Sequence, residues 1–202
     1  MFKHSIPALF PLVAPSLTWK VNTADKALYI TFDDGPHPKI TPKVLDILDE
    51  YQIKATFFCV GENVKKYPDV FQDLISRGHA IGNHTYNHLS GYTTPNDTYY
   101  QNIEEAAKHI DSKLFRPPYG RITPRQIAHL KQHYQIVMWS ILTRDYEAHL
   151  NLERAKVNLI KEIKPGDVIV FHDSEKAAKN MFALLPHILE HFKKLHYSFL
   201  PL

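Results

Sequence analysis

Residues 27–36 read ALYITFDDGP, a short apolar run that ends in two aspartates, a glycine and a proline. The β-branched and aromatic residues in this run predict a buried strand over 27–32. Thr41 and Pro42 follow as the predicted N-cap and first turn of a helix. This strand–turn–helix unit is the element from which the fold can be predicted.

The same alternation of strands and helices continues along the chain. It predicts an α/β fold, with a parallel sheet covered by helices. About seven such units without a long interruption favour a parallel (β/α) barrel, and an open doubly wound sheet is the alternative. The first turn lacks the glycine pattern that cradles a dinucleotide phosphate. The other strands are expected at 54–60, 80–83, 114–116, 135–141, 167–172 and 197–200, and the other helices at 68–77, 98–111, 123–130, 152–163 and 179–194.

Length and composition indicate one soluble globular domain. The 202 residues are 44% hydrophobic and 22% charged, and the formal net charge is only +3. The chain has no dense run of lysine and arginine, so nucleic acid is not an expected partner. We expect an N-terminal arm over residues 1–26, packed on a single domain over residues 27–202.

The expected arm carries a modest apolar stretch at residues 6–13. Pro7 and Pro11 interrupt this stretch, and it is too short to span a bilayer, so no transmembrane segment is expected. A secretory signal is the alternative, but the apolar region is weak and no clear cleavage site follows it. These features favour a cytoplasmic protein, with the cell envelope as the alternative location.

Polar residues with useful chemistry stand at the ends of the predicted strands. The loops after the strands of a parallel barrel build the active site, so these side chains are expected on one face. They are Asp33 and Asp34 after the first strand, His84 and His88 after the third, Arg116 and Tyr119 after the fourth, Asp145 after the fifth, and His172 at the end of the sixth.

Two histidines four residues apart, His84 and His88, are candidate metal ligands. On one helical turn or in a tight loop, both rings can point the same way. The pair alone is a weak signal, because two surface histidines explain it equally well. A carboxylate from another strand end strengthens it, since two histidines and one aspartate are a common catalytic zinc set. The same donors also suit other first-row divalent ions.

The doublet Asp33-Asp34 can serve both metal binding and proton transfer. Adjacent residues of an extended segment point to opposite sides, so one carboxylate can bind an ion while its neighbour stays free. The free carboxylate can then take a proton from a water whose pKa the ion lowers. A turn before Gly35 and Pro36 also favours aspartate, and the two interpretations are compatible. His172 is a candidate general acid, and a satisfied core histidine is the alternative.

These residues fall into five motifs that resemble those of the polysaccharide deacetylases, carbohydrate esterase family four. The motifs stand in the family's order and span most of residues 27–174, and their combination is very specific. They are Thr31-Phe-Asp-Asp-Gly-Pro36, His84-Thr-Tyr-Asn-His88, Arg116-Pro-Pro-Tyr-Gly120, the segment from Trp139 to Tyr146, and Val170-Phe-His172, with valine where leucine is usual.

The resemblance implies a distorted (β/α) barrel and hydrolysis of N-acetyl groups on the amino sugars of peptidoglycan or chitin-like glycans. Asp34, His84 and His88 would bind a divalent metal, usually Zn²⁺, with Co²⁺, Ni²⁺ or Mn²⁺ as alternatives. Asp33 would be the general base and His172 the general acid. Arg116 would orient the base, the backbone N–H of Tyr119 would stabilise the oxyanion, and Asp145 and Trp139 would support the site.

The fourth motif departs from the family pattern at one position. Leu142 stands where an aspartate is usual, and the later Asp-Trp pair becomes Asp145-Tyr146. The missing aspartate normally helps to tune the acidic histidine through the arginine. We expect Asp145 or Asp173 to take over this duty.

Two alternatives to a glycan deacetylase stay open. A hydrolase of the same fold could cleave amide or imide bonds outside sugars, and Tyr146 and the short loops are compatible with that. A glycan-binding relative could have lost catalysis. Every expected base, acid and ligand position is filled, which argues against the second alternative.

Overall fold

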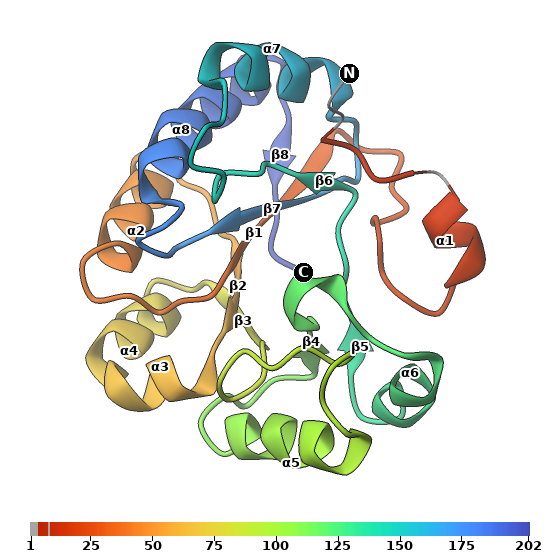
Figure 1. Cartoon of the computed structure of the whole chain (residues 1–202). Helices are drawn as coiled ribbons and strands as arrows, with labels where there is room; N and C mark the ends of the chain where they lie inside the picture. Colours follow the sequence, from red (N-terminus) through yellow and green to blue (C-terminus); the bar gives the residue numbers. More distant parts are fainter. Residues whose placement is uncertain (1–3, 8) are drawn as a thin grey trace.

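A curled sheet of parallel strands forms the centre of the molecule (Figure 1). This computed structural model describes residues 4–7 and 9–202. Within them the strand order is β5-β4-β3-β2-β1-β7-β6, and β8 pairs with β1. The bounds are β1 Ala27–Asp33, β2 Thr56–Cys59, β3 Ala80–Asn83, β4 Leu114–Phe115, β5 Gln135–Ile136, β6 Ile141–Leu142, β7 Val168–His172 and β8 Ser198–Phe199.

Helices surround this sheet on its outer face (Figure 1). The expected fold class, a distorted parallel α/β barrel, is confirmed. In the described part of the chain, β5 and β6 are the two edges and do not pair, so the barrel is open between them. The helices are α1 Leu9–Val13, α2 Thr41–Glu50, α3 Gly61–Lys66, α4 Pro68–Ser76, α5 Asn96–Ala107, α6 Pro124–Leu130, α7 Leu152–Glu162 and α8 Ala178–Lys194, with a 3₁₀ turn η1 at Pro118–Gly120.

Alternate residues of β1 serve the two faces of the sheet, and all of them are buried. Ile30 and Phe32 pack in the large core beneath the helices. Ala27 and Tyr29 belong to a separate cluster on the other face. Asp33 shares the face of Tyr29 by this alternation, so the last residue of the strand points into the barrel.

The segment expected as one strand over 135–141 is two strands at opposite edges of the sheet. β5 pairs with β4, whereas β6 pairs with β7. The backbone between them leaves the ladder, because the N–H of Met138 donates to the carbonyl of Thr18. The carbonyls of Val137 and Met138 accept hydrogen bonds from the buried side chain of Arg116. A run of apolar residues therefore crosses from one edge of the sheet to the other.

The N-terminal segment lies along this crossing (Figure 1). Isolated bridges join Ser5 to Ile141 and Thr18 to Val137. Residues 1–3 and 8 of the expected arm lie outside the described residues. Among residues 4–7 and 9–202, no helix is both long and apolar enough to cross a bilayer.

Two threonines were expected to begin helices, and only one of them is an N-cap. Thr123 caps α6 in a reciprocal capping box with Gln126. Thr41 was expected to cap α2, but that prediction is wrong: Ile40 holds the cap position and Thr41 is the first helical residue. The hydroxyl of Thr41 bonds to Asp173 instead, beside the ends of β1 and β7. The short helix α3 was not predicted, because its six residues are too few to show a helical period.

Candidate active site

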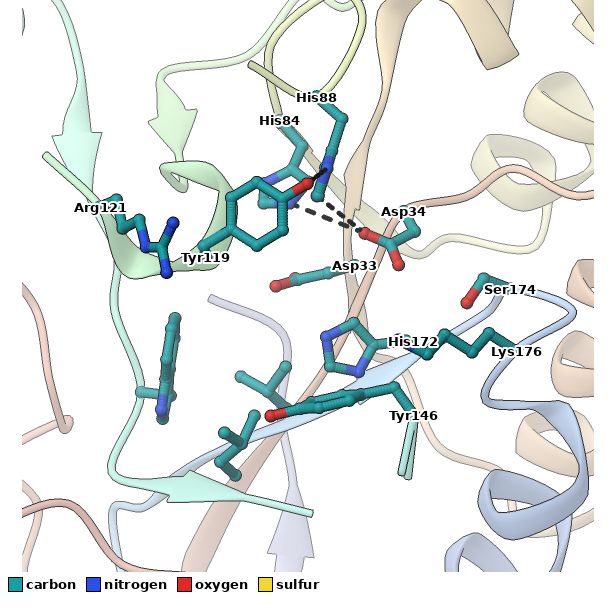
Figure 2. Close-up of a pocket in the computed structure, with 13 residues that line it drawn as sticks. Asp33, Asp34, His84, His88, Tyr119, Arg121, Tyr146, His172, Ser174 and Lys176 are labelled. Carbon is teal, nitrogen blue, oxygen red and sulfur yellow. Dashed lines mark hydrogen bonds and ion pairs between the residues drawn. The ribbon is translucent and has the colours of Figure 1, made fainter. Parts of the chain in front are cut away.

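One cleft of about 510 Å³ collects the ends of the strands. Figure 2 shows the side chains that line it, with Asp33 near its centre. Of the residues expected in the site, Arg116 and Asp145 lie behind this surface and are fully buried. The others line the cleft: Asp33, Asp34, His84, His88, Tyr119, Trp139 and His172.

Three candidate metal ligands meet on one side of the cleft, which we call the metal side: Asp34, His84 and His88. One donor atom from each lies within 4.8 Å of the others. The Nε2 atoms of His88 and His84 are 3.2 and 3.9 Å from Oδ1 of Asp34 (Figure 2). The set of two imidazoles and one carboxylate fits a divalent ion of the zinc type.

The second ring nitrogen of each histidine on the metal side is occupied. Nδ1 of His84 donates to the carbonyl of Arg116 at 2.7 Å, and Nδ1 of His88 lies 3.1 Å from the hydroxyl of Tyr119. These contacts leave both Nε2 atoms to face Asp34, as in the orienting bonds of known metal sites. Burial lowers the pKa of His84 to about 4, so its ring is neutral and able to act as a ligand at pH 7.

Left-handed backbone conformations shape the metal side. Asp34, Thr85, His88 and Tyr119 have φ angles of 83°, 65°, 60° and 60°. Such conformations cost energy in residues with a side chain, and they cluster at functional sites. The two histidines therefore lie in a tight loop, the second of the two placements that their spacing allowed.

The carboxylate of Asp34 is held in its charged form. Burial would raise its pKa, but the hydrogen bond from His88 and the charges of His172, His84 and His88 outweigh burial. The net effect is a pKa well below the usual range. An ionised carboxylate is the form that binds a cation.

Asp33 points away from the metal side to Arg116. Nη1 of Arg116 is 2.6 Å from Oδ1 of Asp33 and 2.8 Å from the hydroxyl of Thr31. The rest of the guanidinium donates to the carbonyls of Val137 and Met138. Because all these partners are fixed by the backbone or the core, Arg116 holds the Asp33 carboxylate in one position.

The opposite side of the cleft, which we call the acid side, consists of His172 and Asp145. Oδ1 of Asp145 is 2.7 Å from Nδ1 of His172, and Oδ2 accepts the His172 backbone N–H at 2.8 Å. Burial alone would lower the pKa of His172, but the hydrogen bond and charge of Asp145 raise it to about 9. The imidazole is therefore protonated at neutral pH.

The side chain of Asp173 does not hydrogen-bond to the imidazole of its neighbour His172. Its carboxylate accepts hydrogen bonds from the backbone N–H of Gly35 at 3.0 Å and from the hydroxyl of Thr41. A Cβ on Gly35 would lie 2.1 Å from this carboxylate, so only glycine fits there. Of the two aspartates expected beside His172, Asp145 makes the contact.

The family model "Polysaccharide deacetylase" matches residues 20–136. The chain belongs to the polysaccharide deacetylase family. A peptidoglycan-N-acetylglucosamine deacetylase of Bacillus cereus is 36% identical over 191 residues, which cover 91% of this chain and 89% of that protein. A chitooligosaccharide deacetylase of Azorhizobium caulinodans is 35% identical over 163 residues, covering 76% and 77%.

The fold of this deacetylase is also close to that of solved relatives. A crystal structure of a peptidoglycan N-acetylglucosamine deacetylase, in complex with 4-naphthalen-1-yl-N-oxidanyl-benzamide, has a TM-score of 0.89 at 30% identity. The match covers 98% of this chain and 95% of that one. The resemblance read from the five motifs is thus confirmed, and with it the class of hydrolase that acts on carbon–nitrogen bonds.

The cleft of this polysaccharide deacetylase also contains Arg121, Ser174 and Lys176, which lie outside the five motifs. Charged side chains on exposed loops follow no periodic pattern, so the sequence offers no signal for them. Leu142 lies in the cleft with its apolar side chain at the place of the missing aspartate. Tyr146 and Val170, which belong to the fourth and fifth motifs, complete the lining.

Proposed function

We propose that this chain deacetylates an N-acetylated glycan by dividing the reaction between the metal side and the acid side of the cleft. The observation that supports this most strongly is the position of Asp33. It is a carboxylate next to a three-ligand set but tied to Arg116 rather than to the histidines. A metal hydrolase needs such a free base beside its ion.

Asp34, His84 and His88 would hold the ion, and Zn²⁺ fits this donor set best. When bound there, a divalent ion supplies Lewis-acid chemistry, because it polarises a carbonyl oxygen and acidifies a neighbouring water.

Asp33 would take the proton from the attacking water. The water oxygen then forms a bond to the acetyl carbon, and the proton moves to the carboxylate of Asp33. The ion pair with Arg116 keeps this carboxylate directed into the cleft. Since Arg116 itself is buried and makes its other bonds to Thr31, Val137 and Met138, it is a positioning residue.

His172 would supply the proton that the leaving nitrogen requires. An amide breaks only when its nitrogen departs as an amine, so the C–N bond cleaves as the imidazolium donates its proton. The products are acetate and the free amino sugar. Asp145 holds the imidazolium at Nδ1, which leaves Nε2 as the atom that donates.

The turn η1 would supply an oxyanion donor through the backbone N–H of Tyr119. Trp139 supports this turn: a Cβ on Gly120 would lie 2.7 Å from the Trp139 ring, so the ring packs directly against the glycine. The charge that develops on the acetyl oxygen is then met by a donor fixed in the backbone.

The relatives named for peptidoglycan and chitooligosaccharide deacetylation favour one of these two glycan classes as the substrate. Deacetylation of a non-sugar amide is the second candidate, and the apolar side chain of Leu142 in the cleft is the observation that favours it. A silent binding protein is disfavoured, because every residue proposed as ligand, base or acid lies in one cleft.

The test is acetate release by the purified, zinc-loaded protein. We expect acetate from chitin oligomers or from peptidoglycan glycan strands, and loss of release on chelation that returns when Zn²⁺ is added. Turnover of a cyclic imide or ureide with no acetate from any glycan would favour the second candidate. Tight glycan binding without acetate from a broad panel would favour the silent protein.

The location of the protein remains a prediction. A peptidoglycan substrate, of the kind that the relatives are named for, favours the cell envelope, and the cytoplasm is the alternative location. Fractionation of cells that express the full chain would decide between the two.

A further inference from the structure

Each side of the cleft carries an aromatic ring with a cation above it. On the metal side, the Tyr119 ring packs edge-on against His88, with 4.6 Å between ring centroids. The guanidinium of Arg121 lies 5.5 Å from the centroid of the same tyrosine ring. A cation over an aromatic face is attracted by the ring, which limits the positions that the Arg121 side chain adopts.

The acid side repeats this arrangement with different residues. The Tyr146 ring packs edge-on against His172 at 5.1 Å, and Nζ of Lys176 lies 5.5 Å from its centroid. Figure 2 shows Arg121 and Lys176 on opposite sides of the cleft, with Asp33 between them. We call these two cations the cationic rim.

The charges of the lining residues are unequally distributed. Apart from Asp33, Asp34 and the histidines, the charged side chains that line the cleft are the two cations of the rim. Asp33 is already paired with Arg116, and Asp34 faces the histidines. The outer part of the cleft is therefore positive.

Ion pairs do not neutralise the charges of the rim cations. In the part of the chain that the structure describes, neither Arg121 nor Lys176 belongs to any ion pair. Five lysines elsewhere do form ion pairs: Lys20 with Asp167, Lys54 with Asp49, Lys108 with Glu105, Lys156 with Glu153, and Lys194 with Glu190. Positive groups placed over rings on both sides of a substrate cleft are available to a negative ligand.

We propose that the cationic rim binds carboxylates carried by the glycan on the two sides of the reacting acetamide. The substrate is then an acidic N-acetylated glycan rather than a neutral one. The planar fork of Arg121 matches a carboxylate, and Lys176 offers a point charge on the other side. This inference rests on the proposed deacetylation, since it concerns the groups that flank the acetyl group in the same cleft.

The experiment compares each acidic glycan with the same glycan after its carboxylates have been neutralised. Peptide-free peptidoglycan strands carry lactyl carboxylates, and carbodiimide coupling to methylamine neutralises these groups without touching the acetamides. A polymer of N-acetylglucosamine and glucuronic acid, treated the same way, supplies ring carboxylates instead. Chitin oligomers serve as the neutral reference, and kcat/KM for acetate release is measured on all substrates.

We expect kcat/KM to be about tenfold higher for the charged than for the neutralised form of at least one polymer. Each exposed ion pair between a rim cation and a glycan carboxylate contributes little, but the two pairs act together. Arg121→Gln and Lys176→Gln should each lower this ratio about threefold, and the double variant should bring it close to one. Raising the salt to 0.5 M should also reduce it, since the pairs are exposed. The polymer that shows the ratio identifies the source of the carboxylate.

Arg125→Gln and Lys179→Gln are the matched controls, because both cations are exposed, lie close in sequence to the rim and do not line the cleft. Their ratios should equal that of the unaltered protein. A ratio of one in the unaltered protein on both polymers, with acetate still released, would overturn the inference alone. An equal loss of ratio in rim and control variants would overturn it too. No acetate from any substrate would instead overturn the proposed function.

Discussion

The metal side and the acid side of the cleft are built in different ways. On the metal side, residues such as Asp34 and His88 adopt left-handed backbone conformations, and the resulting bends bring three donor atoms together. On the acid side, His172 is the last residue of a regular strand, and a buried aspartate sets its charge. One side is thus determined by backbone shape within short motifs, and the other by a contact between segments 27 positions apart.

Loss of the metal side should have the largest effect. His88→Ala removes a proposed ligand that is partly exposed, so folding should survive. We expect bound zinc to be lost and turnover to fall about a thousandfold, because the ion contributes several kcal/mol to the transition state. Metal analysis and acetate release check this, with His129→Ala on the exposed face of α6 as the control. Full zinc content with normal turnover would rule out the ligand assignment.

Loss of the acid side should reduce turnover but not metal binding. His172→Ala should lower amide hydrolysis about 10²- to 10⁴-fold, the range for loss of a general acid. An aryl acetate has a leaving group that needs no proton, so its hydrolysis should fall much less. Parallel assays of both substrates and of bound zinc make this distinction. Equal losses on amide and aryl ester would contradict a role for His172 as acid.

The charge of Asp145 should be visible in the pH profile. The raised pKa of about 9 keeps His172 protonated, so the alkaline limb of kcat/KM should lie near pH 9. Asp145→Asn removes the charge that favours the imidazolium, and the limb should move down toward the ordinary value of about 6.5. An unchanged limb would mean that another group sets it.

The free energy of unfolding should depend on pH through the same group, His172. A folded-state pKa above the unfolded value stabilises the fold at pH values below the unfolded pKa, about 6.5, and this contribution disappears as the pH rises through about 9. The difference in Tm between the unaltered protein and Asp145→Asn should therefore be larger at pH 6 than at pH 9.5. A difference that grows with pH would contradict the assignment.

The smallest effect should come from the hydroxyl that orients His88. Tyr119→Phe removes the bond to Nδ1 but keeps the ring, so zinc affinity should fall about tenfold, the low end for orienting partners. Competition with a chelator measures this affinity. Tyr92→Phe, another exposed tyrosine, should leave it unchanged.

The two sides also differ in how far the sequence could predict them. The barrel and the metal side follow from local patterns: alternation of strands and helices, and three candidate ligands in two short motifs. The choice of Asp145 over Asp173 depends on the path of the chain after β6. That path could not be predicted, because a largely apolar run over 135–141 does not reveal that its middle bonds to Thr18 and Arg116.

The division of tasks between neighbouring aspartates is tested most directly by a pair of isosteric variants. Asp33→Asn and Asp34→Asn are compared for zinc bound per chain and for acetate released. We expect Asp33→Asn to bind zinc normally and to lose about 10²- to 10⁴-fold in turnover, because only the base is gone. Asp34→Asn should lose both zinc and turnover. Normal turnover in Asp33→Asn, or loss of zinc from it equal to that in Asp34→Asn, would contradict the account.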